Sequence, residues 1–148
     1  MAKSNTAPVK LTTADYARLA AFRYALRSFV HFSESAAAKL GLTGQQYQAM
    51  LFVRSRQDGA PVSIADLANE LLIKHNSAVG LADRLVAQEL MARERAPEDR
   101  RTAQLRLTAK GERILGRLAR VHREKLRRIG PDIHRILGEL SGAWRGRG

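Results

Sequence analysis

The stretch SIADLANELLIKHNSAVGLADRLVAQ, residues 63–88, decides the fold of this chain. Ser63 and Asp66 have the spacing of a helix-capping pair, which predicts that a short helix begins there. The chain then breaks at residues 72–74, and a second helix is expected to run to about Gln88. The side chains expected to face inward are those of Ile64, Leu67, Ala68, Leu71, Ala78, Leu81 and Leu85. Two short helices joined by a tight break form a helix-turn-helix, whose second helix enters the major groove of DNA.

A hairpin is predicted directly after this pair of helices. Residues 90–95 and 102–107 read as strands, and apolar and polar residues alternate cleanly along the second. Such a hairpin forms a wing that reaches the neighbouring minor groove, where a narrow groove attracts inserted arginine. We expect Arg101 at the charged tip to point outward and Asp99 to brace it through hydrogen bonds, with Arg100 open to either role. An ordinary charged turn, neutralised in water, is the alternative interpretation of this tip.

Long helices are predicted on both sides of this region. Thr12 and Asp15 indicate a helix start and Gly41 a helix end, so roughly 27 helical residues would span about 40 Å. The apolar residues Leu19, Phe22, Leu26 and Phe29 recur with a spacing that calls for a partner helix, and Ser33 interrupts the pattern. Thr43 and Gln46 predict the start of another helix, which should end near Gln57.

After the hairpin, Thr108 is expected to begin a further helix. Gly130 and Pro131 predict a break in it, followed by a short last helix to about Leu140.

The composition of the 148-residue chain favours a nucleic-acid partner. The net charge is +12, and residues 93–128 hold 13 Lys/Arg against 5 Asp/Glu. A balance this basic favours a polyanionic partner, most often nucleic acid. The chain has no cysteine, which fits a reducing cytoplasm, and no apolar run near the roughly 18 residues needed to cross a bilayer. We therefore expect a cytoplasmic protein without a membrane partner.

Four segments together resemble the winged helix-turn-helix of MarR-type transcriptional regulators. They are IADLANEL (64–71), LADRL (81–85), PEDRR (97–101) and LRLTAKG (105–111). The resemblance implies a homodimer in which each subunit places one winged helix on half of a palindromic operator in double-stranded DNA. It also implies a small anionic or phenolic effector between the dimerisation helices and the DNA-binding lobe. The wing-tip arginine of the family corresponds to Arg101, and its acidic support to Asp99.

The resulting prediction is a mainly α fold with a small two- or three-stranded β-wing. Residues 1–11 form a flexible tail, residues 12–42 an N-terminal dimerisation helix, and residues 43–108 the winged helix-turn-helix lobe. Residues 109–148 form the C-terminal helices for dimerisation.

The recognition helix departs from the family pattern. Lys74 stands where the family has Ser or Thr, Gly80 where it often has Arg or Lys, and Glu89 where it usually has Gly. We expect modest base readout, with Asn pairing with adenine, Ser with several bases and Val with a thymine methyl. The recognition-helix candidates are Lys74, His75, Asn76, Ser77, Val79 and Arg84. Candidates for contacts with the DNA backbone are Ser63 and Arg54.

Other side chains carry two readings. Phe22, Leu26, Tyr47 and Met50 are effector-pocket candidates, although apolar residues at helical spacing are more often core. The four histidines are scattered without ligand spacing, so no metal site is expected, and His122 reads as a helix-face residue. An arginine stripe lies either in solvent or along backbone phosphates, and comprises Arg113, Arg117, Arg120, Arg123 and Arg127.

The residues distinguish among three classes of function. The chain shows no Gly-rich phosphate loop, paired catalytic carboxylates or Ser–His arrangement, so no enzyme and no cofactor are expected. A dimeric DNA-binding regulator, with repression of a palindromic operator relieved by an aromatic or anionic ligand, is the main hypothesis. A basic winged-helix protein that binds nucleic acid architecturally, without operator choice, is the alternative.

Overall fold

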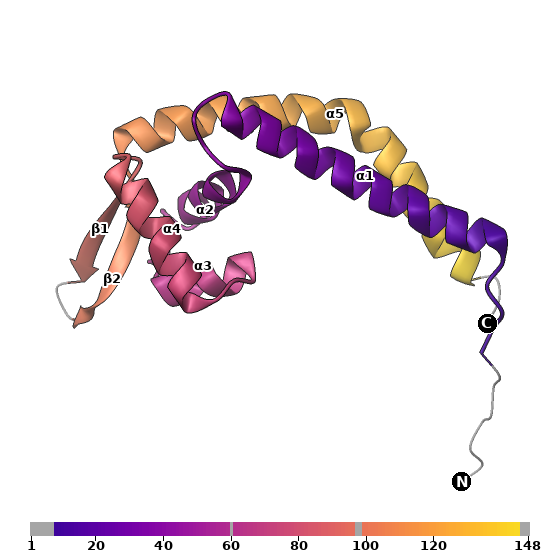
Figure 1. Cartoon of the computed structure of the whole chain (residues 1–148), viewed down its shortest axis with the longest axis horizontal. Coiled ribbons are helices and arrows are strands. Elements are labelled where there is room, and N and C mark those ends of the chain that lie inside the picture. The colour runs from indigo at the N-terminus through magenta and orange to yellow at the C-terminus, as the bar shows by residue number, and fades with distance from the viewer. Residues whose placement is uncertain (1–7, 60, 97–98, 146–148) are drawn as a thin grey trace, which may run out of the picture. The chain divides into compact units, whose positions relative to one another are not determined.

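The structure is a computed structural model that describes residues 8–59, 61–96 and 99–145, with side chains for 8–59, 61–95 and 103–142. The chain forms two compact units. Unit 1 combines Met1–His31 with Glu124–Gly148, and unit 2 is Phe32–Arg123. Helices α1 (Thr13–Ala38) and α5 (Ala109–Arg145) each run from one unit into the other (Figure 1).

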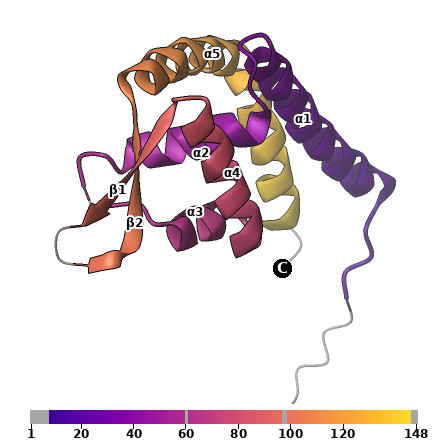
Figure 2. The same ribbon diagram turned by 60° about the vertical axis from the view of Figure 1, so that its left-hand side comes forward.

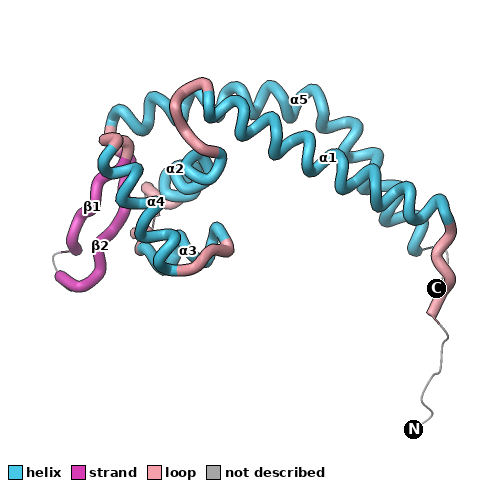
Figure 3. Tube along the Cα trace, viewed as in Figure 1, coloured by secondary structure: helices cyan, strands magenta, loops and turns pink. Residues whose placement is uncertain are grey.

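Unit 2 contains the predicted helix-turn-helix. Helices α2 (Gly44–Ser55), α3 (Ile64–Leu71) and α4 (His75–Ala87) are short, and only residues 72–74 separate α3 from α4 (Figure 3). The Oγ1 of Thr43 accepts the Gln46 N–H at 3.1 Å and the Gln46 side chain accepts the Thr43 N–H at 3.0 Å. Ser63 and Asp66 form the same reciprocal pair at the start of α3. Each such cap stabilises its helix by about 1 kcal/mol, and both predicted helix starts are confirmed.

The predicted hairpin follows α4. Strands β1 (Met91–Ala96) and β2 (Asp99–Leu107) pair antiparallel, with Met91 opposite Leu107 and an irregularity between Arg95 and Ala96. A single bridge adds Val62 to the sheet, because the Leu105 N–H donates to the Val62 carbonyl at 2.8 Å. The mainly α fold with a small β-wing is thus confirmed. The second strand begins at Asp99, however, whereas the alternation of residue types predicted residues 102–107.

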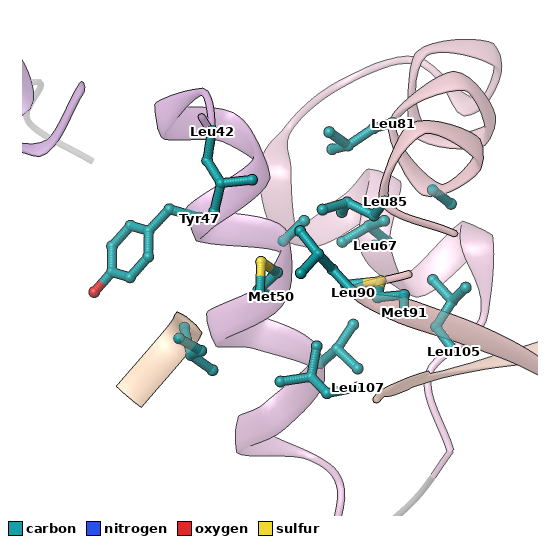
Figure 4. Packing of buried hydrophobic residues seen from close by; sticks show 14 of the residues in the cluster. Leu42, Tyr47, Met50, Leu67, Leu81, Leu85, Leu90, Met91, Leu105 and Leu107 are labelled. Carbon is teal, nitrogen blue, oxygen red and sulfur yellow. The ribbon is translucent and has the colours of Figure 1, made fainter. Parts of the chain in front are cut away.

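The core of unit 2 lies where α2, α3 and α4 meet the hairpin (Figure 4). Met50 from α2, Leu67 from α3 and Leu85 from α4 are fully buried, and Leu105 from β2 closes the cluster. Most of the predicted inward-facing residues are in this core, while Ile64 and Leu71 are partly buried at its edge. Burial of one such leucine stabilises the fold by about 1.5–3 kcal/mol.

Helix α1 ends as its sequence predicts. After Ala38 the chain turns, and Gly41 adopts the left-handed conformation with φ of 74°. The Leu42 N–H then donates to the Ala37 carbonyl at 3.0 Å, which closes the helix end. Glycine adopts this backbone without the steric cost that a side chain would add.

The predicted break at Gly130 and Pro131 is wrong, because α5 continues through Pro131 to Arg145. A proline normally clashes with the Cβ of the preceding residue when that residue is helical. Gly130 has no Cβ, so this clash is reduced, while Pro131 still lacks an N–H for the helix and its ring still crowds the Arg127 carbonyl. Ile129 and Ile133 on either side are half-buried against α1 in unit 1. This packing favours the continuous helix.

Unit 1 has very little interior of its own. Among its described residues only Asp15 and Leu140 are buried, and a cavity of about 360 Å³ separates parts of α1 and α5. The exposed large apolar side chains of α1 and α5 in this unit are Tyr16, Tyr24, Leu26, Val30, Leu126 and Leu137. None of the helices in the described ranges is both long and apolar enough to cross a membrane.

Candidate nucleic-acid interface

Helix α4 presents one face to the core and its first turn to solvent. Ala78, Leu81 and Leu85 are buried, so the helix is held from one side. The side chains at its start are exposed, namely Lys74, His75, Asn76 and Ser77. Arg84, nearer the end of the helix, is also exposed. Val79 is half-buried. The core therefore holds α4 in place, and all of the recognition-helix candidates except Val79 have exposed side chains.

Lys74 is the residue that precedes α4, and its side chain makes no cap hydrogen bond. The first backbone N–H groups of a helix carry partial positive charge, so an ammonium beside them is unfavourable without an anion. The start of α4 combines these donors with an exposed lysine. A phosphate oxygen is the chemical group that such a combination accommodates best.

The hairpin is tied to α4 and crosslinked by ion pairs. Arg93 on β1 contacts Asp83 on α4, and Arg106 on β2 contacts Glu94 on β1 at 3.1 Å. These pairs are exposed, so each contributes less than about 1 kcal/mol, but they fix which basic side chains are already engaged. The sequence did not identify either pair, although Asp83 and Arg93 carry opposite charges at neighbouring element ends.

The start of α4 and the far end of the hairpin lie at the same end of unit 2 (Figure 2). The start of α5 lies at the opposite end in both Figure 1 and Figure 2. Within unit 2 the exposed Arg113, Arg117, Arg120 and Arg123 therefore belong to a different basic surface from α4 and the hairpin.

The predicted wing residues are only partly described. Asp99, Arg100 and Arg101 are the first residues of β2 by their backbone, not part of the turn as the sequence suggested. Their side chains, like Pro97 and Glu98, lie outside the described residues. The outward role of Arg101 and the bracing role of Asp99 therefore stay predictions.

The two backbone-contact candidates differ in what already engages them. Ser63 Oγ accepts the Asp66 N–H at 3.1 Å, which leaves its own O–H to donate. Arg54 donates from Nε to Glu112 at 3.0 Å and lies 3.7 Å from Asp58. Its guanidinium thereby joins α2 to α5. A phosphate contact by Arg54 would compete with this ion pair, whereas one by Ser63 would complement its cap.

The four effector-pocket candidates fall into different units. Phe22 and Leu26 belong to unit 1, where they are half-buried and exposed, whereas Tyr47 and Met50 are buried in unit 2. A cavity of about 260 Å³ in unit 2 is lined by other residues. They are Phe32, Ser35, Ala36, Lys39, Leu40, Arg117, Leu118 and Val121. Its mainly apolar wall with two cations suits a small amphipathic anion, and no sequence signal brought Lys39 and Arg117 together.

His122 lies on a face of helix α5, as the sequence suggested, and that face is turned inward. It is buried, and its ring stacks on Tyr47 with 4.2 Å between centroids. Nδ1 lies 2.7 Å from the Leu118 carbonyl and Nε2 2.8 Å from Ser33 Oγ. A carbonyl only accepts, so Nδ1 carries the proton. The partner on α1 is Ser33, the residue that interrupted the apolar pattern.

Burial raises the pKa of Tyr47 above its ordinary value of 10.0, so the phenol is neutral at physiological pH. No cluster of three or more potential metal ligands occurs among residues 8–59, 61–96 and 99–145.

Comparison with known proteins places this geometry in context. Residues 40–102 match the model of the MarR family. MepR of Staphylococcus aureus, a transcription regulator of the multidrug efflux pump MepA, has a TM-score of 0.73 at 13% identity over 93% of this chain and 100% of its own. AbsC, a MarR family transcriptional regulator from Streptomyces coelicolor, has a TM-score of 0.71 at 21% identity over 95% and 100%.

The repressor CouR, solved bound to a 23-mer DNA duplex, has a TM-score of 0.67 at 22% identity over 93% of this chain and 99% of its own. These TM-scores show a shared fold. No curated protein matches the chain.

Proposed function

We propose that this chain is a transcriptional regulator of the MarR family, rather than an enzyme, and that it represses transcription as a homodimer on a palindromic operator. One observation carries the proposal: α4 is packed on the core along one side and exposes Lys74, His75, Asn76 and Ser77 at its start. A helix held this way, with a hairpin at the same end of the unit, suits a major groove and the adjacent minor groove.

The DNA-binding part is tested by the salt dependence of affinity. If each subunit makes about three to five phosphate contacts, a dimer on its operator should give a slope of about −5 to −9 in log affinity against log salt. Operator fragments are first selected from random DNA and then compared with unrelated DNA at one salt concentration. A flat slope would exclude DNA binding. Equal affinity for selected and unrelated DNA would favour an architectural protein without operator choice.

The dimer is proposed on the apolar surface of unit 1. This unit buries almost nothing by itself while exposing Tyr24, Leu26 and Leu137, and a surface of this kind is typical of a protein interface. Leu26 and Leu51 are equally exposed, at 43% and 44%, but Leu51 lies on α2 in unit 2. Leu26→Glu should therefore yield monomers in light scattering, while Leu51→Glu should leave the dimer intact. A monomeric wild-type chain at micromolar concentration would contradict the proposal.

The effector is proposed to be a small aromatic anion bound in the 260 Å³ cavity of unit 2. Its apolar wall would hold a single ring, and Lys39 and Arg117 would pair with a carboxylate. Benzoate serves as the probe. It should weaken operator binding by the wild type and less so by Arg117→Gln, while Arg113→Gln, one turn earlier on α5, should respond like the wild type. An equal response of all three proteins would place the effector elsewhere.

A further inference from the structure

Leu72 occupies an unusual position between α3 and α4. Its φ of 55° and ψ of 42° are left-handed, and its side chain is 92% exposed. Apart from glycine, only Leu72 and Glu89 have positive φ in the described part of the chain. A bulky aliphatic residue in this conformation is a genuine outlier.

The conformation itself is required by the fold. The Ile73 N–H donates to the Ala68 carbonyl at 3.0 Å, and the Leu72 N–H to the Asn69 carbonyl at 3.3 Å, which closes the end of α3. The chain then turns so that Ile73 packs against the core and Lys74 directly precedes α4. Glycine or asparagine meets this demand at least cost.

A leucine at this place is unfavourable in the free protein. Its Cβ adds steric strain to the left-handed backbone, and its isobutyl group gains nothing from burial because water surrounds it. Glu89 differs, because a charged side chain is well solvated and the Glu89 carbonyl accepts the Thr108 hydroxyl at 2.6 Å. Strained residues of this kind concentrate at binding sites. Contact with a binding partner would bury the isobutyl group of Leu72 and offset this cost.

We propose that Leu72 contacts the apolar surface of operator DNA, a deoxyribose or a thymine methyl group, an inference that rests on the proposed function. The position is continuous with the exposed start of α4, where Lys74, His75 and Asn76 follow it directly. Helix α4 itself offers little exposed apolar surface for DNA contact, because Val79 is half-buried and Gly80 has no side chain. Leu72 provides such a surface from the turn before α4.

Three variants at this position test the proposal on selected operator DNA. Leu72→Gly should raise the melting temperature by about 2–4 °C as strain in the left-handed backbone is relieved, yet weaken operator affinity about tenfold as apolar contact is lost. Leu72→Asn tolerates the same backbone without the flexibility of glycine, and should lose a similar affinity. Leu72→Met keeps the apolar contact and should stay within about twofold of the wild type.

The controls separate this proposal from the proposed function. If the wild type binds no DNA, the proposed function fails. If the wild type binds DNA and Leu72→Asn binds it equally well, the proposed Leu72 contact is wrong. This holds even if Leu72→Gly binds more weakly, because a more flexible turn alone would explain that result. Uracil in place of single thymines then identifies the group contacted. If uracil at one position lowers the affinity of the wild type but not that of Leu72→Asn, Leu72 contacts the methyl group of that thymine. If uracil lowers the affinity of the wild type at no position, Leu72 contacts a deoxyribose.

Discussion

Replacement of Gly111 by alanine should open the junction between the hairpin and α5. A Cβ built at Gly111 would lie 2.1 Å from the Leu90 carbonyl oxygen and 3.0 Å from its carbon. Ordinary contact begins at 3.4 Å, so the backbones of Leu90 and Gly111 must separate by about 1.3 Å. Both contacts are with backbone atoms, so no side-chain rotation can relieve them.

The hydrogen bonds around this junction set the magnitude. The Thr108 N–H donates to the Leu90 carbonyl at 3.1 Å, the Gly111 N–H to Thr108 Oγ1 at 3.0 Å, and the Thr108 hydroxyl to the Glu89 carbonyl. Loss of two of them costs about 2 kcal/mol, and overpacking adds about 1–3 kcal/mol. The better helix propensity of alanine returns up to about 1 kcal/mol. The unfolding free energy should therefore fall by about 2–4 kcal/mol.

Gly116 on the same helix provides the control. A Cβ there would meet only the flexible guanidinium of Arg120 at 3.8 Å, so Gly116→Ala should raise stability by up to about 1 kcal/mol. Thermal unfolding followed by circular dichroism at one protein concentration should show Gly111→Ala melting about 4–16 °C below the wild type and Gly116→Ala about 2–4 °C above it. Equal melting temperatures for the two variants would refute the close approach of Leu90 and Gly111.

Three further predictions concern the wing and the buried contacts of unit 2. Arg101→Ala should weaken binding to operator and unrelated DNA alike, and Asp99→Ala should also weaken DNA binding. If Asp99→Ala binds DNA more tightly than the wild type at the same salt concentration, the Asp99 carboxylate does not hold Arg101 in position. Ser33→Ala removes the hydroxyl that contacts His122 and should lower the unfolding free energy by about 1–2 kcal/mol in urea titrations, so an unchanged midpoint would contradict that hydrogen bond. Because the pKa of Tyr47 is raised in the folded state, its contribution to stability is fully present below pH 10.0 and is lost as pH rises through the folded-state pKa. Tyr47→Phe should therefore lose less stability than the wild type in alkali. Parallel curves of unfolding free energy against pH for the two proteins would count against burial as the cause of the raised pKa.

Local signals in the sequence predicted much of unit 2. The Thr43–Gln46 and Ser63–Asp66 pairs act within three residues, so their spacing alone specified where α2 and α3 begin. Gly41 marked the end of α1 for the same reason, since its left-handed backbone is a local property. The alternation in residues 102–107 likewise indicated a strand, and Leu105 and Leu107 of that strand are buried.

The remaining features depend on residues that are distant in the chain. Ser33 and His122 are 89 positions apart, so nothing local predicts their hydrogen bond or the burial of the imidazole. Pro131 was a strong breaking signal that Gly130 and the packing of Ile129 overrode. Lys39 and Arg117 line one cavity only because α1 and α5 come together there. Tertiary packing, which outweighs local propensity, explains each difference.

The passage of α1 and α5 from one unit into the other has a consequence for how this protein can change over evolutionary time. No flexible linker joins the units at residues 31–32 or 123–124, because both junctions fall within continuous helices. Insertion of one residue into either helix would rotate everything beyond it by about 100° and advance it by about 1.5 Å. In the proposed dimer, the two DNA-binding lobes would then fall out of phase with the half-sites of the operator. On this proposal, the lengths of the two helices should be inherited together with operator spacing.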